Sequence, residues 1–316
     1  MLKSRLKQMW KNRIQYRFKS PLQSNCPEFA RLFPQGAKLQ RVARGFEFTE
    51  GPVWFGERQV LLFSDIPANI IYQLSATGEV TVFRKPSHHA NGLTRDRQGQ
   101  LIACEHGTRR VTRTEMDGKI TPLAVSFNGK KLNSPNDVVV KSDGAIYFTD
   151  PPYGIEPQQQ EQPMQGVYLI SGDRTETEIL LVADDFEKPN GLAFSPDEKT
   201  LYVDDSQRRH IRVFDVLENG KLGNSRIFAD MNVKEPGLPD GMKCDRQGNL
   251  YCTGAAGVWI FNPQGTHLGT ILTPEQPSNC AWGDDDGQTL YITAQTSLYK
   301  IRVNSPGIPV FPSLPA

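Results

Sequence analysis

The sequence predicts an all-β protein, a six-bladed β-propeller closed by an N-terminal strand, and three observations support this. A short turn motif built on Asn, Asp or Glu recurs six times in the 316-residue chain. Successive motif residues lie 41, 45, 54, 50 and 39 positions apart, in or near the spacing of propeller blades. Strand-like runs rich in Val, Ile, Tyr and Phe follow the motifs, and no stretch after residue 37 keeps an apolar stripe at helical period.

Each copy of the motif opens one repeat unit. The motif is followed by a short apolar-leaning run, a polar turn and a second strand-like run. One such unit cannot bury both faces of its sheet, so six units are expected to pack radially around a channel. The six copies read Thr49-Glu50-Gly51-Pro52, Ala90-Asn91-Gly92, Pro135-Asn136-Asp137, Pro189-Asn190-Gly191, Pro239-Asp240-Gly241 and Ser278-Asn279-Cys280.

The ends of the chain complete the predicted order of elements. Residues 1–37 read as a basic N-terminal extension, residues 38–303 as the propeller and catalytic domain, and residues 304–316 as a Pro-rich tail. Only 37 residues follow the last motif, so the sixth blade is expected to be one strand short. The run from Leu39 to Arg44 is the candidate for the missing strand, which would close the ring.

Charge is distributed unevenly along the chain. The net charge is +1, but residues 1–20 hold seven basic and no acidic residues, which leaves 29 basic against 35 acidic residues in the remainder. A propeller of net charge −6 is a poor candidate for binding nucleic acid. For the basic segment three alternatives stay open: a loosely docked extension, a contact with a membrane surface or a partner, and a targeting segment.

The lengths of the apolar runs and the number of cysteines bear on the cellular location of the protein. No run of the sequence is long enough to span a bilayer, and the basic start lacks the apolar core of a secretory signal. The five cysteines are an odd number and form no Cys-x-x-Cys pair. They are expected to be small buried residues in a reducing compartment, so a cytoplasmic location is the default.

The motifs are expected to form a metal site. The innermost strand of each blade starts at one mouth of the channel, so the six motif residues should ring that mouth. Two carboxylates in one narrow channel repel each other unless a cation lies between them. Oxygen ligands favour Ca²⁺, with Mg²⁺, Mn²⁺ and Zn²⁺ as alternatives. The expected ligands are Glu50, Asn190 and Asp240, with Asn136 either completing the shell or holding a metal-bound water.

Any single copy also has a structural interpretation. Asn and Asp before a strand are common turn formers, and this role is favoured for Asn91 and Asn279. Glu50 is different, because Glu gains little from a turn position.

Rim residues supply candidates for contacts with a substrate. His106 either contacts a substrate oxygen or is an exposed loop histidine with no role in the site. Tyr153 is expected to line the pocket. Asp150, at the end of a predicted strand, is either a general base or a strand-ending turn residue.

Four of these segments resemble the SMP-30/gluconolactonase/luciferin-regenerating family. They are Glu50-Gly51-Pro52-Val53-Trp54, Ser134-Pro135-Asn136-Asp137, Pro189-Asn190-Gly191-Leu192 and Pro239-Asp240-Gly241-Met242. The resemblance covers residues 38 to 303 and is greatest to bacterial gluconolactonases. It implies a six-bladed propeller with one divalent metal held by Glu50, Asn190 and Asp240, with Asn136 near metal and substrate. Regucalcin-type members carry Arg where this chain has Ser134, which puts their aldonolactone preference in doubt.

The implied activity is metal-dependent opening of a lactone. The cation would polarise the carbonyl, and a carboxylate would take a proton from the attacking water. Asp240 is the first candidate for this base and Asp150 the second. The alternatives are a phosphotriesterase or arylesterase on the same scaffold, and a non-catalytic propeller that binds calcium or a protein partner.

Overall fold

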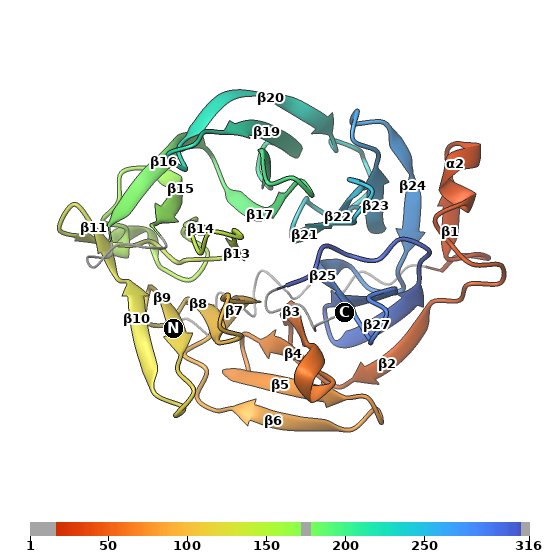
Figure 1. The fold of residues 1–316 in the computed structure, drawn as a ribbon, viewed down its shortest axis with the longest axis horizontal. Coiled ribbons are helices and arrows are strands. Elements are labelled where there is room, and N and C mark those ends of the chain that lie inside the picture. Colours follow the sequence, from red (N-terminus) through yellow and green to blue (C-terminus); the bar gives the residue numbers. More distant parts are fainter. Residues whose placement is uncertain (1–16, 172–177, 311–316) are drawn as a thin grey trace.

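The protein is a ring of six β-sheets around a central channel (Figure 1). The computed structural model describes residues 17–171 and 178–310. Each sheet is antiparallel, with the strand that starts at a motif innermost, so the predicted six-bladed propeller is confirmed. The blades in chain order are β3(Thr49–Phe55), β4(Val60–Asp65), β5(Ile70–Ser75), β6(Val80–Arg84); β7(Ala90–Arg95), β8(Leu101–Glu105), β9(Arg110–Thr114), β10(Ile120–Ala124); β13(Val138–Val140), β14(Ile146–Thr149), β15(Gln165–Ile170), β16(Ile179–Phe186); β17(Pro189–Phe194), β18(Thr200–Asp205), β19(His210–Val216), β20(Leu222–Asp230); β21(Met242–Cys244), β22(Leu250–Gly254), β23(Gly257–Phe261), β24(His267–Leu272); and β25(Pro277–Gly283), β26(Thr289–Ala294), β27(Ser297–Arg302).

An N-terminal strand closes the sixth blade, as predicted. Strand β2 (Gln40–Arg44) lies antiparallel to β27, with Gln40 opposite Lys300 and Arg44 opposite Ser297 (Figure 1). The last sheet therefore contains one strand from the start of the chain and three from its end. This pairing covers the outer edge of β27 and joins the start of the ring to its end.

The described part of the expected extension packs against the propeller. Strand β1 (Leu22–Ser24) adds a fifth strand to the fifth blade by pairing with β24, and the short helix α2 (Pro27–Ala30) follows it (Figure 1). Phe29 is 1% exposed and belongs to a core cluster with Tyr251 and Leu268. Residues 22–37 are therefore bound to the ring, which differs from the expected boundary at residue 37. The basic residues before Arg17 lie outside the described residues.

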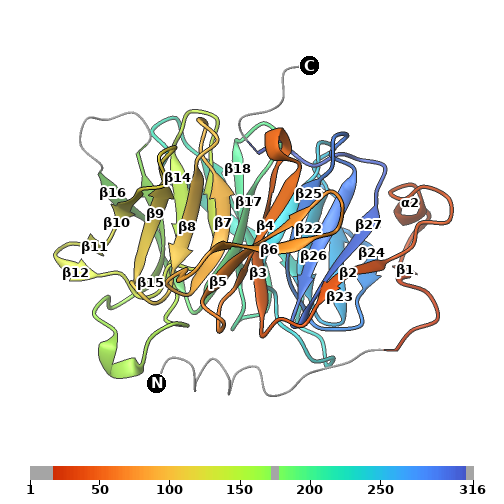
Figure 2. The same ribbon diagram turned by 90° about the horizontal axis from the view of Figure 1, so that it is seen from below.

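The C-terminal tail crosses the far mouth of the channel, opposite the motifs. Pro306, Ile308 and Val310 line the cavity at that mouth, whereas the green loop with η2 (Pro157–Gln159) projects at the motif mouth (Figure 2). Arg246 N–H donates to Pro306 O at 2.9 Å and Ile308 N–H donates to Cys244 O at 3.3 Å. The described part of the predicted tail, residues 304–310, thus belongs to the folded domain.

The core consists of six apolar clusters. Side chains from facing sheets form them, for example Leu61 and Phe63 of blade 1 with Ala281 and Tyr291 of blade 6. This sheet-on-sheet packing fixes where each innermost strand begins. Besides α2 and η2, β11 (Ser126–Phe127), β12 (Lys130–Lys131) and η1 (Gly56–Arg58) lie outside the blades. Strands β11 and β12 form a hairpin, and η1 is a 3-10 turn.

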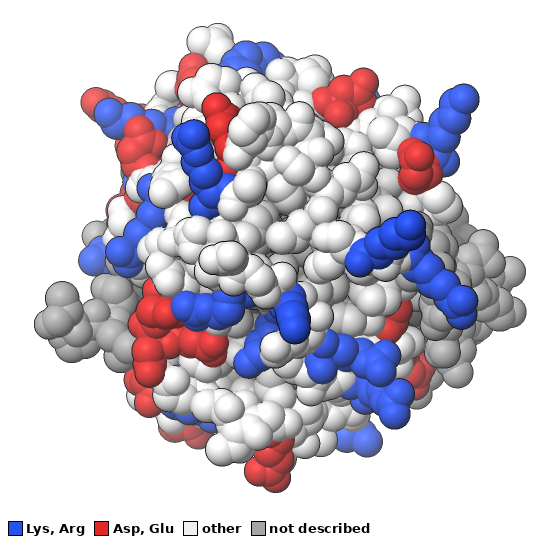
Figure 3. Space-filling view, turned by 90° about the vertical axis from the view of Figure 1, so that its right-hand side faces the viewer, with Lys and Arg blue, Asp and Glu red and all other residues white. Residues whose placement is uncertain are grey.

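Three further features concern helix length, the cysteines and the surface charges. Among the described residues, no helix is long and apolar enough to cross a membrane. All five cysteines are free, and four of them are buried. On the side that carries α2, basic and acidic side chains are interspersed among wide uncharged areas (Figure 3).

Candidate metal and lactone site

A β-bulge marks the motif in four blades. The pairing of the two innermost strands shifts register at Glu50/Val53, Ala90/Leu93, Pro189/Leu192 and Pro277/Asn279. A bulge inserts an extra residue and changes the direction of a side chain. The bulges thus let side chains at the motif leave the alternating strand pattern and face the channel mouth.

Neighbouring motifs are interlocked around this mouth. Gly241 N–H donates to Ser278 O at 2.7 Å, and Ser278 Oγ donates to Thr49 O at 2.7 Å, which links blades 5, 6 and 1. A Cβ on Gly191 would lie 2.2 Å from Asp240 O, and one on Gly241 would lie 2.0 Å from Asn279 Cγ. In these two copies glycine follows the motif residue because the next motif occupies the space that a side chain would need.

The amides of three motifs form a continuous chain of hydrogen bonds. Asn91 Nδ2 donates to Asn136 Oδ1 at 2.6 Å, and Asn136 Nδ2 donates to Asn190 Oδ1 at 2.5 Å. Asn190 Nδ2 donates to Ser206 Oγ at 3.0 Å, and Ser206 donates to Pro239 O at 2.7 Å. All three asparagines are at most 6% exposed. This chain orients the amides along the ring from blade 2 to the residue before Asp240.

Carboxylates occupy two of the other ring positions, Glu50 and Asp240. Burial, followed by the charge of Asp137, raises the pKa of Glu50 to about 7. Burial and the neighbouring Glu50 raise the pKa of Asp240 well above its ordinary value. Asp204 is fully buried, and its Oδ1 makes no hydrogen bond to any residue that the structure describes. Besides burial, the charge of Asp137 contributes to the raised pKa of Glu50, Asp204 and Asp240, so four carboxyl groups lie close together here.

This donor set fits a hard divalent cation. In the described part of the chain, no three side chains among His, Cys, Asp and Glu are grouped to hold a metal by themselves. A cation at this mouth would thus take amide oxygens together with carboxylates, a combination that suits Ca²⁺. Glu50 and Asp240 repel each other, and a cation between them would relieve that repulsion. Asn190 lies beside Asp240, to whose carboxylate its amide is hydrogen-bonded.

The carboxylate of Asp150 is hydrogen-bonded to the backbone. Its two carboxylate oxygens accept the backbone N–H groups of Asn133 and Ser134, both at 2.7 Å. Asp65 and Asp205 end the second strands of blades 1 and 4 and hold two backbone N–H groups in the same way. Burial raises the pKa of Asp150 to about 7, but both oxygens are directed at the loop that leads into the motif. The geometry favours the structural alternative for Asp150.

His106 lies in the site as a neutral ring. It is 2% exposed, and its Nε2 is 3.3 Å from both Asn91 Nδ2 and Asn136 Oδ1. Burial lowers its pKa to about 4, so the imidazole is uncharged at neutral pH. His106 is therefore not the exposed loop histidine of the alternative interpretation.

Tyr153 lies at the rim on the side of Asp240. It is half-buried, lies beside Ser206, and has Lys188 Nζ 5.7 Å from its ring centre. Burial raises its pKa although a hydrogen bond with Ser206 acts in the opposite sense, so the phenol stays protonated. Its loop is fixed by Ser134, whose Oγ accepts Gly154 N–H at 2.9 Å.

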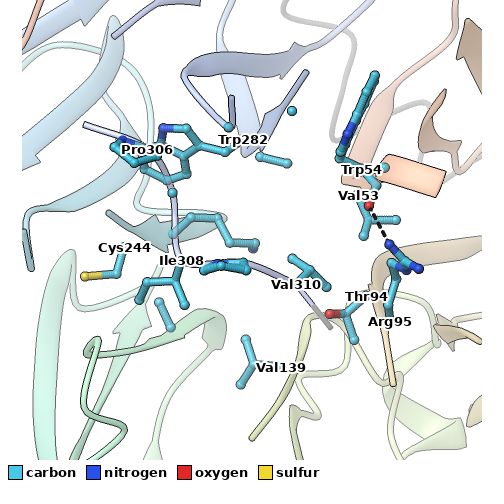
Figure 4. Close-up of a pocket in the computed structure, with 18 of the residues that line it drawn as sticks. Val53, Trp54, Thr94, Arg95, Val139, Cys244, Trp282, Pro306, Ile308 and Val310 are labelled. Atoms are coloured by element: carbon cyan, nitrogen blue, oxygen red, sulfur yellow. Dashed lines mark hydrogen bonds between the residues drawn. The ribbon is translucent and has the colours of Figure 1, made fainter. Parts of the chain in front are cut away.

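A second cavity, of about 300 Å³, lies at the far mouth. Figure 4 shows Pro306, Ile308 and Val310 of the tail running across it, with Trp54 and Trp282 on its wall. Its lining is mainly apolar and holds none of the expected metal ligands. The candidate site is therefore at the motif mouth.

Three residues of the site were given no role from the sequence. Asp137 and Asp204 bring further carboxylates, and Lys243 Nζ lies 3.8 Å from Asp137 Oδ2. Their contacts join different blades, so no local pattern indicates them. The available signals were the aspartate directly after Asn136 and the aspartate directly before Asp205.

Comparison with known proteins places the chain in a family. The model of the SMP-30/gluconolactonase/LRE-like region matches residues 48–296, which include all six motifs. The chain belongs to this family. It is 36% identical to a gluconolactonase of Zymomonas mobilis over 89% of this chain and 85% of that protein.

Two further relatives show the range of the family. A solved gluconolactonase structure from Xanthomonas campestris superposes with a TM-score of 0.83 at 35% identity, covering 92% of this chain and 97% of that one. Regucalcin of Sus scrofa is 28% identical over 77% of this chain and 82% of its own length.

Proposed function

We propose that this chain is a metal-dependent lactonase that opens a sugar lactone by attack of water on the carbonyl carbon. The observation that carries the proposal is the ring of buried Glu50, Asn136 and Asn190 and half-buried Asp240 at one channel mouth, in a chain similar to gluconolactonases. The substrate would be a small molecule, because the ring lies in a narrow channel mouth. Ca²⁺ is the proposed cation, with Mg²⁺, Mn²⁺ and Zn²⁺ as alternatives.

The proposed ligands make different contributions to cation binding. Glu50 and Asp240 supply charge and Asn190 supplies a neutral oxygen, while Asn136 completes the shell or holds a water. When bound, the cation would polarise the lactone carbonyl and stabilise the negative charge that develops on its oxygen. The amide chain from Asn91 to Asn190 fixes the orientation of these groups before substrate arrives.

Asp240 is the proposed general base. Its carboxylate is half-buried, whereas Glu50 is 3% exposed, so Asp240 is the more accessible of the two. Burial and the charge of Glu50 raise its pKa, and a carboxylate with a higher pKa is a stronger base. Asp150 is not needed for this step, since both of its oxygens hold backbone N–H groups.

Three polar groups are proposed to position the substrate. His106, uncharged at neutral pH, and Asn136 are in mutual contact and offer hydrogen bonds to hydroxyl groups of a sugar ring. Tyr153 closes the rim beside Asp240 and offers a protonated phenol. Ser134 is uncharged, and its hydroxyl oxygen accepts the backbone N–H of Gly154.

A substrate panel tests the proposal. Sugar lactones, aliphatic lactones, a phosphotriester and an aryl ester are compared by acid release at saturating Ca²⁺. We expect a sugar lactone to have the highest kcat/KM, and Asp240→Asn to lose that activity while Asp150→Asn, if folded, keeps most of it. Faster hydrolysis of the phosphotriester or aryl ester would refute the substrate class. No hydrolysis of any ester would favour a non-catalytic binding propeller.

A further inference from the structure

Lys243 is the charged residue in the layer of the channel just below the motif ring. It lies three positions after Asp240. The residues three positions after the other five motif residues line the same cavity and carry no charge: Val53, Thr94, Val139, Ala193 and Trp282. An ammonium group in such a place needs partners, because burying an unpaired charge is costly.

The partners of Lys243 come from across the channel. Its Nζ lies 3.8 Å from Asp137 Oδ2 of the blade 3 motif and 3.4 Å from Asn279 Oδ1 in blade 6, and it donates to Met242 O at 2.9 Å. Asn279 Nδ2 also donates to Asp137 Oδ2 at 3.4 Å. The side chain of Lys243 is 21% exposed and that of Asp137 is 3% exposed. These three residues form a floor that joins blades 3, 5 and 6 beneath the ring.

The floor lies directly against the proposed metal ligands. Asn279 is hydrogen-bonded to Glu50, and the charge of Asp137 is the largest charge effect on Glu50. Lys243 acts on Glu50 in the opposite sense, as an attractive charge. It also faces the buried thiol of Cys280. The positive charge of Lys243 therefore partly offsets the charges of Glu50 and Asp137, which form a cluster with Asp204 and Asp240.

We propose that Lys243 is a positioning residue that serves as a built-in counter-ion of the site. It lets Asp137 and the ring carboxylates share one channel in the metal-free protein. Because it is positive, it also opposes a divalent cation in the ring, so it weakens metal binding and keeps that binding reversible. The second effect rests on the proposed metal site, whereas the first does not.

Metal affinity separates this role from a purely structural one. In Lys243→Met, which keeps the length of the side chain and removes its charge, we expect Ca²⁺ to bind about tenfold tighter or more in calorimetry. Loss of a merely structural contact would loosen the site and weaken binding. The control is Lys141→Met, since Lys141 is also 21% exposed and paired with an aspartate, Asp143, on the surface. Unchanged or weaker Ca²⁺ binding in Lys243→Met would overturn the proposed effect on affinity.

Thermal unfolding of the chelated protein tests the first effect without metal. Lys243→Met should lower the unfolding midpoint, and adding Asp137→Asn, which removes the unpaired charge, should recover part of the loss. A double variant no more stable than Lys243→Met alone would overturn the counter-ion role. If the wild-type protein binds no divalent cation, the proposed metal site fails, and this comparison still decides the role of Lys243.

Discussion

Removing the metal should make the stability of the protein strongly dependent on pH, and Glu50 gives the magnitude. Its side chain is 3% exposed, and its pKa lies at about 7 in the folded protein against an ordinary value of 4.5. This difference corresponds to about 3 kcal/mol of unfolding free energy. Because the folded-state pKa is the higher one, the contribution of Glu50 to the stability of the metal-free protein is fully present below about pH 4.5. It is lost as pH rises from there through about 7.

The assay is thermal unfolding of the chelated protein between pH 5 and pH 8. For a chain of this size, about 3 kcal/mol corresponds to a decrease in midpoint of about 6 °C. Glu50→Gln cannot ionise, so its midpoint should fall less over the same range. Ca²⁺ added at pH 8 should restore the wild-type midpoint, because it compensates the ionised carboxylates. A chelated wild-type midpoint that stays constant or rises between pH 5 and pH 8 would refute the reasoning.

Three further predictions concern single residues. Asp240→Asn should keep the fold and lower kcat of lactone hydrolysis by on the order of 10²–10⁴, because it removes the base and a ligand charge; near-normal kcat would exclude that role. Glu50→Gln should weaken Ca²⁺ binding in calorimetry more than Asn91→Ala, which removes no charge; equal affinities would contradict the ring assignment. Phe29→Ala should destabilise the protein by about 3–5 kcal/mol in denaturant unfolding, since Phe29 is buried against blade 5. Loss below 1 kcal/mol would mean that the N-terminal segment is loosely attached.

The fold was predictable because it repeats. Six motifs at blade spacing indicate the number of blades, and the short sixth unit indicates that a strand near Leu39 closes the ring. The docking of residues 22–37 was not predictable in this way. Strand β1 has three residues and α2 has four, which is too short for a hydrophobic period to be recognised. Phe29 and its neighbours are apolar residues whose burial depends on the surface of blade 5.

The site was predictable where a residue type was unusual for its position. Glu50 was such a residue, since Glu is a poor turn former, and it indicated the ring as a whole. Asp150 was ambiguous, because an aspartate at a strand end looks the same in sequence whether it holds a loop or takes a proton. Asp137 and Lys243 meet across the channel from blades 3 and 5, and such a contact has no signature in the local sequence.

The most direct test of the metal-dependent mechanism is lactone hydrolysis by one protein preparation that is first chelated and then reconstituted. We predict that chelation abolishes hydrolysis, and that Ca²⁺, Mg²⁺, Mn²⁺ or Zn²⁺ restores it to different degrees. Restored activity should saturate in proportion to the metal bound in calorimetry. A chelated protein, shown to be metal-free, that still hydrolyses lactone at the original rate would contradict the account.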